Sequence, residues 1–435
     1  MNSTENRNKS VLVLNYGCSA NRAIAEGLIG TLKNKLYPIA ESIEDAEVIV
    51  VNTCIVKQNT EHRMKSLLLS LPQRKNLIVT GCLPVVMRNW IIQNLPHAKV
   101  LLPESANQII KLLNKESVNE YKIVDPSVWS QLYTDRIHYY NPIITPIEIS
   151  RGCLSNCAYC IVKKVKGKIR SRSQESILSE IRSVINQGSK EIWLTSQDTG
   201  SYGWDFTPKQ FLPSLIKSIT SIEGKFFVRL GMMTPNILKY FKSELIPQLN
   251  NYKIFNFLHL PIQSGSDSIL RTMRRKESSN YFIELVSSLR QEVKELVIAT
   301  DVIVGFPGES IADFNATKKL LQQVKPLIVN ISRYTDRPGT TAAKMNHKIP
   351  TKIKSSRSKE LSKLTRKISE TNLKKWIGWK GTALIDEIGK KPGQFIGRNT
   401  SYLTVVIEDK LLSLGQLIDI EITDSGSTYL IGEKQ

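Results

Sequence analysis

Short, continuous apolar runs that alternate with helix-like segments are the feature that most limits the fold of this chain. Three such runs open the sequence: VLVLNYGC, which ends at Cys18, AEVIVVNTC, which ends at Cys54, and NLIVTGC, which ends at Cys82. Continuous apolar runs are typical of parallel strands buried on both faces, and parallel strands are joined by helical crossovers. We therefore expect an open α/β domain over residues 10–135.

Each of these three runs ends in a cysteine. The carboxyl ends of parallel strands share one edge of a sheet, so Cys18, Cys54 and Cys82 can meet in space although they are far apart in sequence. Dispersed cysteines at strand ends can also be small packed hydrophobic residues without a ligand. Because all three fall at the same edge, we favour a metal cluster held by these thiolates.

A second alternation of strands and helices begins near Pro146. In the helical pattern SQESILSEIRSVINQG, Ser173 can cap the helix and Gly188 can end it. Six strand–helix units predict a barrel or partial barrel over residues 143–375, with its site at the carboxyl ends of the strands. The last part of this range, 351–375, is a lysine-rich connector helix. The six predicted strands are IEIS, EIWLTSQD, FFVRLGMM, IFNFLHLPIQS, LVIATDVIVGF and PLIVNISRY.

The tail of the chain changes to a β pattern. The segments GTALIDEI, GQFIGRNTSYLTVVI and GQLIDIEITDSG are short strands separated by glycine. This pattern predicts a small, closed or partly open β-barrel over residues 376–435. The predicted fold class is therefore α/β, with an open N-terminal α/β domain, a central (β/α)6 partial barrel and a small C-terminal β-barrel.

The segment RGCLSNCAYC places Cys153, Cys157 and Cys160 in a C-x3-C-x2-C array. Three thiolates on a four-iron cluster leave one iron open, and an open position distinguishes a catalytic metal site from a structural one. Structural zinc needs a fourth ligand at short range, but His138 lies upstream and His259 far downstream. Three buried thiols without a ligand are the remaining alternative. We favour an iron–sulfur cluster.

The charge of the chain predicts an anionic partner. Lys and Arg number 60 against 39 Asp and Glu, a formal net charge of +21. Nucleic acid is the first candidate for this partner and an anionic membrane surface the second. The N-terminus is polar, and the sequence has no run of eighteen apolar residues, so we expect a cytoplasmic protein without a membrane span. In that compartment, cysteines more often serve metal binding or catalysis than disulfides.

The cysteine patterns also resemble those of a known protein family. The C-x3-C-x-aromatic-C array, with Tyr159 as the aromatic residue, resembles the signature of radical S-adenosylmethionine (radical SAM) enzymes. The trio Cys18, Cys54 and Cys82 resembles the auxiliary-cluster domain of one branch, the methylthiotransferases, and the tail resembles their RNA-binding TRAM barrel. The resemblance runs from about Val11 onward. It implies two 4Fe-4S clusters and S-adenosyl-L-methionine as cofactors.

The resemblance implies roles for particular residues. The cluster of Cys153, Cys157 and Cys160 is expected to bind S-adenosylmethionine at its open iron and to be the catalytic centre. Each further contact has a structural alternative, such as a helix cap at Asp198 or a strand-end cap at Gln263. The implied cofactor contacts are Ser196, Gln197 and Asp198 near the methionine amino group, Gln263 and Ser264 near the ribose, Gly305 and Glu309 near the adenine, and Arg333 after the last barrel strand.

The chemistry implied by this resemblance is radical methylthiolation. No side chain acting as an acid, base or nucleophile can attack an unactivated carbon–hydrogen bond, so a cofactor must supply the reactive species. In such enzymes the first cluster cleaves S-adenosylmethionine to a 5′-deoxyadenosyl radical. The auxiliary cluster delivers sulfur, and a further S-adenosylmethionine supplies the methyl group. An electron donor such as flavodoxin or ferredoxin and a sulfur donor are the implied partners.

The implied substrate is N6-threonylcarbamoyladenosine at position 37 of tRNA, in the anticodon stem-loop. LTSQDTGSYGWD and the KK of CIVKKVKGK resemble the archaeal and eukaryotic branch that modifies it, whereas bacterial branches place a proline soon after the third cysteine. Two departures are Lys166, where an arginine commonly precedes the glycine, and the missing C-terminal membrane segment of animal members. Alternatives are isopentenyladenosine in tRNA, a ribosomal-protein aspartate, or an RNA-binding iron–sulfur protein without turnover.

Basic residues near the expected site are candidates for RNA contact. RTMRRK, from Arg271, is one basic cluster, and residues 344–380 hold twelve Lys or Arg against two Glu. A solvated helix face is the plain alternative for the latter. Residues 381–435 hold five basic and eight acidic residues, so bulk charge does not make the terminal barrel an RNA-binding surface. The individual candidates are Lys163, Lys164, Lys166, Lys168, Arg170, Arg337 and Arg398.

Overall fold

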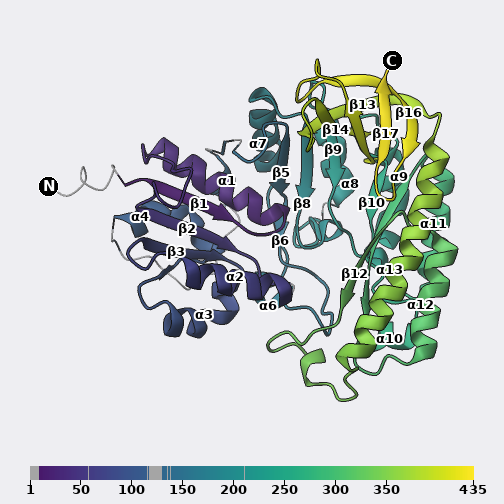
Figure 1. The fold of residues 1–435 in the computed structure, drawn as a ribbon, viewed down its shortest axis with the longest axis horizontal. Coiled ribbons are helices and arrows are strands. Elements are labelled where there is room, and N and C mark those ends of the chain that lie inside the picture. Colours follow the sequence, from purple (N-terminus) through teal and green to yellow (C-terminus); the bar gives the residue numbers. More distant parts are fainter. Residues whose placement is uncertain are drawn as a thin grey trace.

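The α/β class and the terminal β-barrel predicted from the sequence are confirmed. In Figure 1 the N-terminal α/β part lies beside the central partial barrel, and the small barrel caps one end of the central strands. No described helix combines the length and the hydrophobicity that crossing a bilayer requires. The structure is a computed structural model that describes residues 9–56, 58–114, 116, 130–134, 136–137, 139–209 and 211–435.

The N-terminal part is a parallel sheet of order β1-β2-β3-β4 with helices on both faces. Alternate strand residues serve the two faces: Val11 and Val13 pack with α1, whereas Leu12 packs on the side of α2 and α3. The predicted domain end at residue 135 lies outside the described residues. The elements are β1 (Val11–Asn15), α1 (Ser19–Asn34), β2 (Val48–Thr53), α2 (Gln58–Ser70), β3 (Asn76–Gly81), α3 (Leu83–Asn94), β4 (Lys99–Val100) and α4 (Ile109–Leu113).

The central part holds the six predicted strands. They form two parallel sheets, β5-β8-β9 and β10-β11-β12, and a parallel bridge from Val228 to Ile254 joins them into a partial barrel. A short antiparallel pair, β6 and β7, follows β5. The strands are β5 (Ile144–Glu148), β6 (Ser150–Arg151), β7 (Arg170–Ser171), β8 (Glu191–Thr195), β9 (Phe227–Leu230), β10 (Phe257–His259), β11 (Val297–Val304) and β12 (Ile328–Arg333).

Helices cover the outside of this partial barrel. In α7, the Ser173 hydroxyl accepts a hydrogen bond from the Ser176 N–H at 3.3 Å, and Gly188 has a φ of 109° just beyond the helix, so both predicted signals are confirmed. The helices are α6 (Val162–Lys166), α7 (Gln174–Asn186), α8 (Leu212–Thr220), α9 (Lys242–Leu249), α10 (Asp267–Thr272), α11 (Ser279–Glu292), α12 (Ile311–Val324) and α13 (Thr351–Leu373).

The C-terminal barrel closes in the order β13-β14-β15-β17-β16. Its core continues into the amino-terminal ends of the central strands, where Phe257 and Val297 pack in one cluster with Val405. The barrel therefore lies at the opposite end of the central strands from their carboxyl ends. The connector helix α13 runs from one end to the other along β12, as Figure 1 shows. The strands are β13 (Lys380–Ile388), β14 (Gln394–Asn399), β15 (Thr404–Glu408), β16 (Leu417–Ser425) and β17 (Leu430–Lys434).

Tyr402 joins the terminal barrel to the central part. Its ring centroid lies 4.9 Å from that of Phe255 and 5.2 Å from that of Phe257. We expect Tyr402→Ala to destabilise the docked barrel by about 3 kcal/mol, because a large ring is removed from a packed interface. Tyr429→Ala, at an exposed tyrosine of the same barrel, is expected to cost less than about 1 kcal/mol. Thermal unfolding midpoints measure both, and equal midpoints would contradict this account of the interface.

Candidate metal centre and active site

The central cysteine trio lies in the loop between β6 and α6, just past the carboxyl end of β5. The loop folds back on itself, because the Cys160 N–H donates to the Cys157 carbonyl at 3.1 Å. Segments far along the chain hold it on both sides: the Ala158 N–H donates to the Met273 carbonyl at 2.9 Å, and the Ala158 carbonyl accepts from the Ala342 N–H at 2.8 Å. The three thiols are thus presented on a backbone fixed from two directions.

The thiols of this loop are partly buried and influence one another electrostatically. Burial, with a smaller contribution from Asp198, raises the pKa of Cys153 to about 11. Burial, with a smaller contribution from Cys157, raises the pKa of Cys160 to about 12. Clustered thiolates that disfavour one another need a cation to hold them, and metal binding takes the place of the protons. The donor set therefore fits a positively charged metal group.

The geometry favours a cluster over a single ion. Among the described residues, no group of three or more His, Cys, Asp or Glu side chains is placed to hold one metal ion. In a four-iron cluster each thiolate binds a different iron atom, so the sulfurs need not converge on one point. Three thiols in one compact loop fit such a cluster and leave one iron for another ligand.

Arg275 contacts this loop, although the sequence placed it in a basic surface cluster that begins at Arg271. Its guanidinium Nη1 lies 3.7 Å from the Cys157 Sγ, and its Nη2 donates to the Pro261 carbonyl at 2.6 Å. An ion pair with Glu277 fixes the same side chain. Arg275 is therefore a buried partner of the cysteine loop, and nothing in its local sequence distinguished it from its exposed neighbours.

The residues after β8, which the sequence predicts to contact the cofactor, adjoin the cysteine loop. The Gln197 side-chain oxygen accepts from the Gly152 N–H at 2.6 Å, and the Ser196 hydroxyl accepts from the Asp198 N–H at 3.0 Å. Asp198 is fully buried and accepts from the Thr234 N–H at 3.1 Å, and burial raises its pKa. A buried carboxylate beside Cys153 is suited to hold an ammonium group.

Most of the cofactor contacts predicted on the second sheet are buried, and several already bond to other residues of the chain. Gln263 is buried with a φ of 76°, a conformation that a non-glycine residue adopts at a cost. The Ser264 hydroxyl lies 3.4 Å from that of Thr317 in α12. Glu309 accepts from the Gly305 N–H at 2.7 Å and pairs with Arg357 of α13. Arg333 is exposed at the end of β12.

Each cysteine of the N-terminal trio lies just past the carboxyl end of one of three adjacent strands. Cys18 follows β1 at the start of α1, Cys54 follows β2, and Cys82 follows β3. The Cys82 N–H donates to the Thr53 carbonyl at 2.9 Å. Burial is the main reason that the pKa of Cys54 is raised, and Cys18 adds to it. Three thiols on aligned strand ends, two of them, Cys18 and Cys82, at helix N-termini, again fit a cationic cluster.

The two cysteine trios are linked through α6. Ile55 and Cys82 pack in one apolar cluster with Ile161 and Val165, which directly follow the central trio. A second link is the Ser19 hydroxyl, next to Cys18, which lies 2.6 Å from the Thr195 hydroxyl at the end of β8.

Arg337 supplies a third link. It donates to the Ile55 carbonyl and pairs with Glu61 of α2 at 2.9 Å. The two rims therefore border one shared site.

The predicted RNA contacts divide into exposed and buried residues. Lys164 and Lys168 are exposed and Arg170 is half-buried. Lys163 donates to the Ser155 carbonyl at 3.1 Å and so borders the cysteine loop. Three other candidates do not reach the surface freely: Lys166 and Arg337 are buried, and Arg398 pairs with Asp386 at 3.0 Å and Glu387 at 2.8 Å.

A polar group on the second sheet was also missed by sequence reasoning. The His259 Nε2 lies 2.9 Å from the Asp301 Oδ1, which also accepts from the Asn330 side chain at 2.8 Å. These residues lie on β10, β11 and β12. The only signal in the sequence was that each is a polar residue inside an apolar run.

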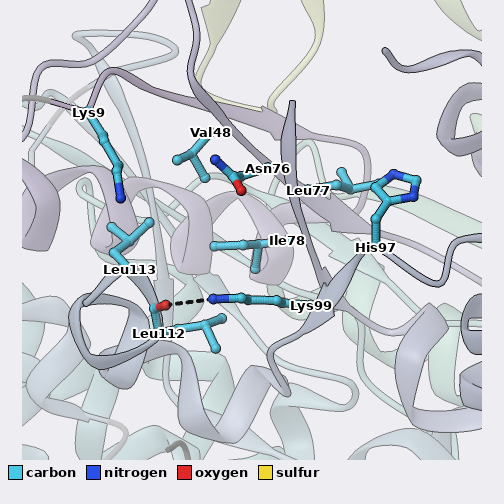
Figure 2. A pocket seen from close by; sticks show the side chains of 9 residues that line it. All are labelled: Lys9, Val48, Asn76, Leu77, Ile78, His97, Lys99, Leu112 and Leu113. Atoms are coloured by element: carbon cyan, nitrogen blue, oxygen red, sulfur yellow. Dashed lines mark hydrogen bonds between the residues drawn. The ribbon is translucent and has the colours of Figure 1, made fainter. Parts of the chain in front are cut away.

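The hollow drawn in Figure 2 is not part of this site. Its lining includes Val48 and Asn76, the first residues of β2 and β3, and Lys99, which donates to the Leu112 carbonyl at 3.3 Å. These residues lie at the amino-terminal ends of the strands, at the edge opposite the cysteines.

Three family models match the chain in order. They are the "Uncharacterized protein family UPF0004" over residues 10–103, the radical SAM superfamily over 147–321 and the TRAM domain over 377–434.

Relatives match over nearly the whole chain. A probable threonylcarbamoyladenosine tRNA methylthiotransferase of Pyrococcus horikoshii is 37% identical over 97% of this chain and 99% of the relative. The human threonylcarbamoyladenosine tRNA methylthiotransferase is 30% identical over 98% of this chain and 74% of the relative. The ribosomal protein uS12 methylthiotransferase of Lachnoclostridium phytofermentans is 29% identical over 97% and 99%.

Solved structures share the fold at low sequence identity. The radical S-adenosylmethionine methyltransferase TsrM from Kitasatospora setae has a TM-score of 0.59 at 12% identity and covers 77% of each chain. The cobalamin-dependent S-adenosylmethionine radical enzyme OxsB has a TM-score of 0.52 at 12% identity, covering 83% of this chain and 58% of the other. At this level of identity the likeness concerns the fold alone.

Gly152 provides a test of the loop geometry. It has a φ of 87°, and a Cβ there would lie 2.0 Å from the Lys168 carbonyl oxygen. Gly152→Ala is therefore expected to displace the central loop and to lower the iron that it retains after reconstitution. Gly167→Ala is the matched control, because Gly167 also has a positive φ but has no atom within 4 Å of that position.

The control is expected to cost about 1–3 kcal/mol of stability through backbone strain and to keep its iron. Iron analysis and thermal unfolding of both variants check this. Full iron retention by Gly152→Ala would show that the loop is not confined as described.

Proposed function

Because the chain belongs to the family of threonylcarbamoyladenosine tRNA methylthiotransferases, we propose that it converts N6-threonylcarbamoyladenosine at position 37 of tRNA to its 2-methylthio derivative. The observation that carries this proposal is the packing of α6, which follows the central three-thiol loop, against Ile55 and Cys82 of the N-terminal three-thiol loops. One loop is suited to a cluster that activates a cofactor, and the other to a cluster that carries sulfur. Methylthiolation requires both at one site.

The cofactors are S-adenosyl-L-methionine and two 4Fe-4S clusters, held by Cys153, Cys157 and Cys160 and by Cys18, Cys54 and Cys82. When bound, they supply a radical able to attack a carbon–hydrogen bond and the sulfur and methyl group to be transferred. The chain's own residues bind, orient and exclude water. Backbone bonds to Ala158 hold the central loop, and the buried Arg275 lies beside one of its thiols.

The residues around the central loop are proposed to position S-adenosylmethionine. The buried Asp198 is suited to the methionine ammonium, with Ser196 and Gln197 supporting the same turn. The strained backbone at Gln263 is consistent with a functional position, since strain persists only where the surroundings enforce it. The other proposed contacts are Ser264, the turn from Gly305 to Glu309, whose side chain is occupied by Arg357, and the exposed Arg333.

The tRNA is proposed to approach over the cysteine loops and along α13. Lys163, Lys164, Lys168 and Arg170 border the central loop, and the connector helix extends for about 35 Å. The terminal barrel carries a local net charge of −3, from five basic and eight acidic residues. Backbone phosphates therefore meet α13 more favourably than the barrel. The exposed basic residues of the connector are Lys352, Lys359, Lys363, Arg366, Lys367, Lys374 and Lys375.

Alternative functions are less well supported. A ribosomal-protein aspartate would need less of this basic surface, although a uS12 methylthiotransferase is 29% identical. An RNA-binding iron–sulfur protein without turnover would not need two cysteine trios at one site.

The remaining proposals concern organisation and partners. We propose functional units at residues 10–135, 143–375 and 376–435. A small electron-transfer protein such as flavodoxin or ferredoxin is proposed as the reductant, with a separate sulfur donor and a cytoplasmic location.

Single cysteine substitutions test the assignment of two clusters. Cys157→Ala and Cys54→Ala are each expected to lower the iron of the reconstituted chain from about eight to about four atoms, because each removes a ligand of a different four-iron cluster. Only Cys157→Ala is expected to abolish release of 5′-deoxyadenosine, whereas both variants lose methylthio product. Iron analysis and anaerobic turnover with tRNA measure this. A Cys157→Ala variant that still cleaves S-adenosylmethionine would refute the assignment.

Modified nucleosides test the substrate. In cells that lack the gene, mass spectrometry of tRNA is expected to show loss of 2-methylthio-N6-threonylcarbamoyladenosine and accumulation of its precursor. An unchanged tRNA profile would contradict the tRNA assignment and would favour a ribosomal-protein substrate.

The RNA path is tested by charge reversal on one face of α13. Lys359, Lys363 and Lys367 are exposed and four residues apart, and changing all three to Glu is expected to weaken tRNA binding at least about tenfold. The slope of log affinity against log salt is expected to fall by about 2–3. Reversal of Lys390, Lys391 and Lys410 in the terminal barrel is the control. An equal loss in both variants would contradict the proposed path.

A further inference from the structure

Lys166 is a buried cation at the centre of the proposed site. It is the last residue of α6, its exposed fraction is 4%, and its Nζ atom has no hydrogen-bond partner among the described residues. Lys163 and Lys164 of the same short helix reach the surface. A buried ammonium without a partner is costly, so a side chain kept in this position indicates an anion that binds there.

The position of Lys166 relates it to both cysteine loops. Val165, the preceding residue, packs in one cluster with Ile55 and Cys82 of the N-terminal loops. The positive charge of Lys166 acts at Cys54, where it opposes the effect of burial on the thiol pKa. Lys166 therefore ends a helix that packs against the N-terminal cysteine loops, and its charge is within electrostatic reach of Cys54.

Two buried carboxylates of the site already have partners. Glu61 of α2 pairs with Lys65 through Oε1 at 2.7 Å and with Arg337 through Oε2 at 2.9 Å. The other buried carboxylate of the site, Asp198, accepts from Thr234. Neither of these carboxylates pairs with Lys166, whose ammonium is left without an anionic hydrogen-bond partner among the residues that the structure describes.

The proposed substrate carries a negatively charged carboxylate on the group attached to N6 of the adenine. The threonylcarbamoyl group at N6 has a ureido N–H that can donate to N1 of the same adenine, and this internal hydrogen bond places the threonine, which carries the carboxylate, on the N1 side of the ring. C2 is the carbon that receives the methylthio group. When C2 approaches the sulfur-bearing loop, the carboxylate comes to the same side of the site.

We propose that Lys166 binds the carboxylate of the threonylcarbamoyl group and so selects an adenosine with an acidic N6 substituent over one with a neutral substituent. This inference rests on the proposed function and names the substrate feature that the site recognises. A charge-assisted hydrogen bond in a buried site is the interaction expected to carry such a preference. Lys166 is then a specificity residue, whereas the sequence had grouped it with lysines that contact phosphate.

Binding of two matched RNAs tests the proposal. One anticodon stem-loop carries N6-threonylcarbamoyladenosine at position 37, and the other carries its methyl ester, which lacks the negative charge. The reconstituted wild-type holoenzyme is expected to bind the acid RNA at least about tenfold more tightly than the ester, since hydrogen bonds to charged groups contribute at this level. Lys166→Met is expected to bind both RNAs about equally, and Lys166→Arg to keep most of the preference.

Lys164→Met is the matched control on the same helix. It removes an exposed charge and is expected to weaken both RNAs by the same factor, so that their ratio stays at the wild-type value. Iron content equal to that of the wild type shows that Lys166→Met is folded and loaded with its clusters.

Two results would overturn the inference: a wild-type preference that persists in Lys166→Met, or equal binding of acid and ester by the wild type. A shift in the reduction potential of the auxiliary cluster in Lys166→Met, with the RNA preference intact, would assign Lys166 to the cluster and would also overturn it. The proposed function has a separate readout. It fails if the wild-type holoenzyme forms no methylthio product on the acid RNA, whichever RNA it binds more tightly.

Discussion

The packing of α6 between the two sets of cysteine loops is the contact on which the rest of the site depends. Ile161 and Val165 on this short helix lie against Ile55 and Cys82, and apolar contact holds the two domains at one separation. Arg337 adds a buried ion pair to Glu61 across the same boundary. A chemistry that uses both clusters requires this separation to be fixed, because sulfur must reach a carbon that the first cluster has activated.

The charges around the central loop show how such a site can be stable. Burial is the main reason that the pKa values of Cys153 and Cys160 are raised, and Cys157 adds to both, while the protein places Arg275 beside Cys157 and Asp198 near Cys153. This arrangement is costly for an empty loop and favourable for one that holds a cationic cluster, since metal binding takes the place of protons. Lys166, next to the N-terminal cysteine loops, is also a buried charge that needs an opposite charge. In the proposed complex, the substrate carboxylate would be its partner.

Much of the architecture was predictable because it depends on local patterns. The strand runs, the Ser173 cap and the strand-end cysteines all follow from periodicity and from the common edge of parallel strands. The burial of Lys166 and Arg275 was not predictable, because each stands in a basic run whose members look alike in sequence. Only contacts with distant segments, such as that of Arg275 with Pro261 and Cys157, separate them from their exposed neighbours. The position of the terminal barrel, at the amino-terminal ends of the central strands, also comes from tertiary packing alone.

The most direct test of the central claim is whether the two clusters lie close together in one site. Electron paramagnetic resonance of the fully reduced, reconstituted chain measures magnetic coupling between them. The account predicts a spectrum broadened by coupling, which simplifies to a single uncoupled cluster in either Cys157→Ala or Cys54→Ala. A wild-type spectrum equal to the sum of the two variant spectra would show that the clusters are independent and far apart, and would contradict the close arrangement on which the proposed function depends.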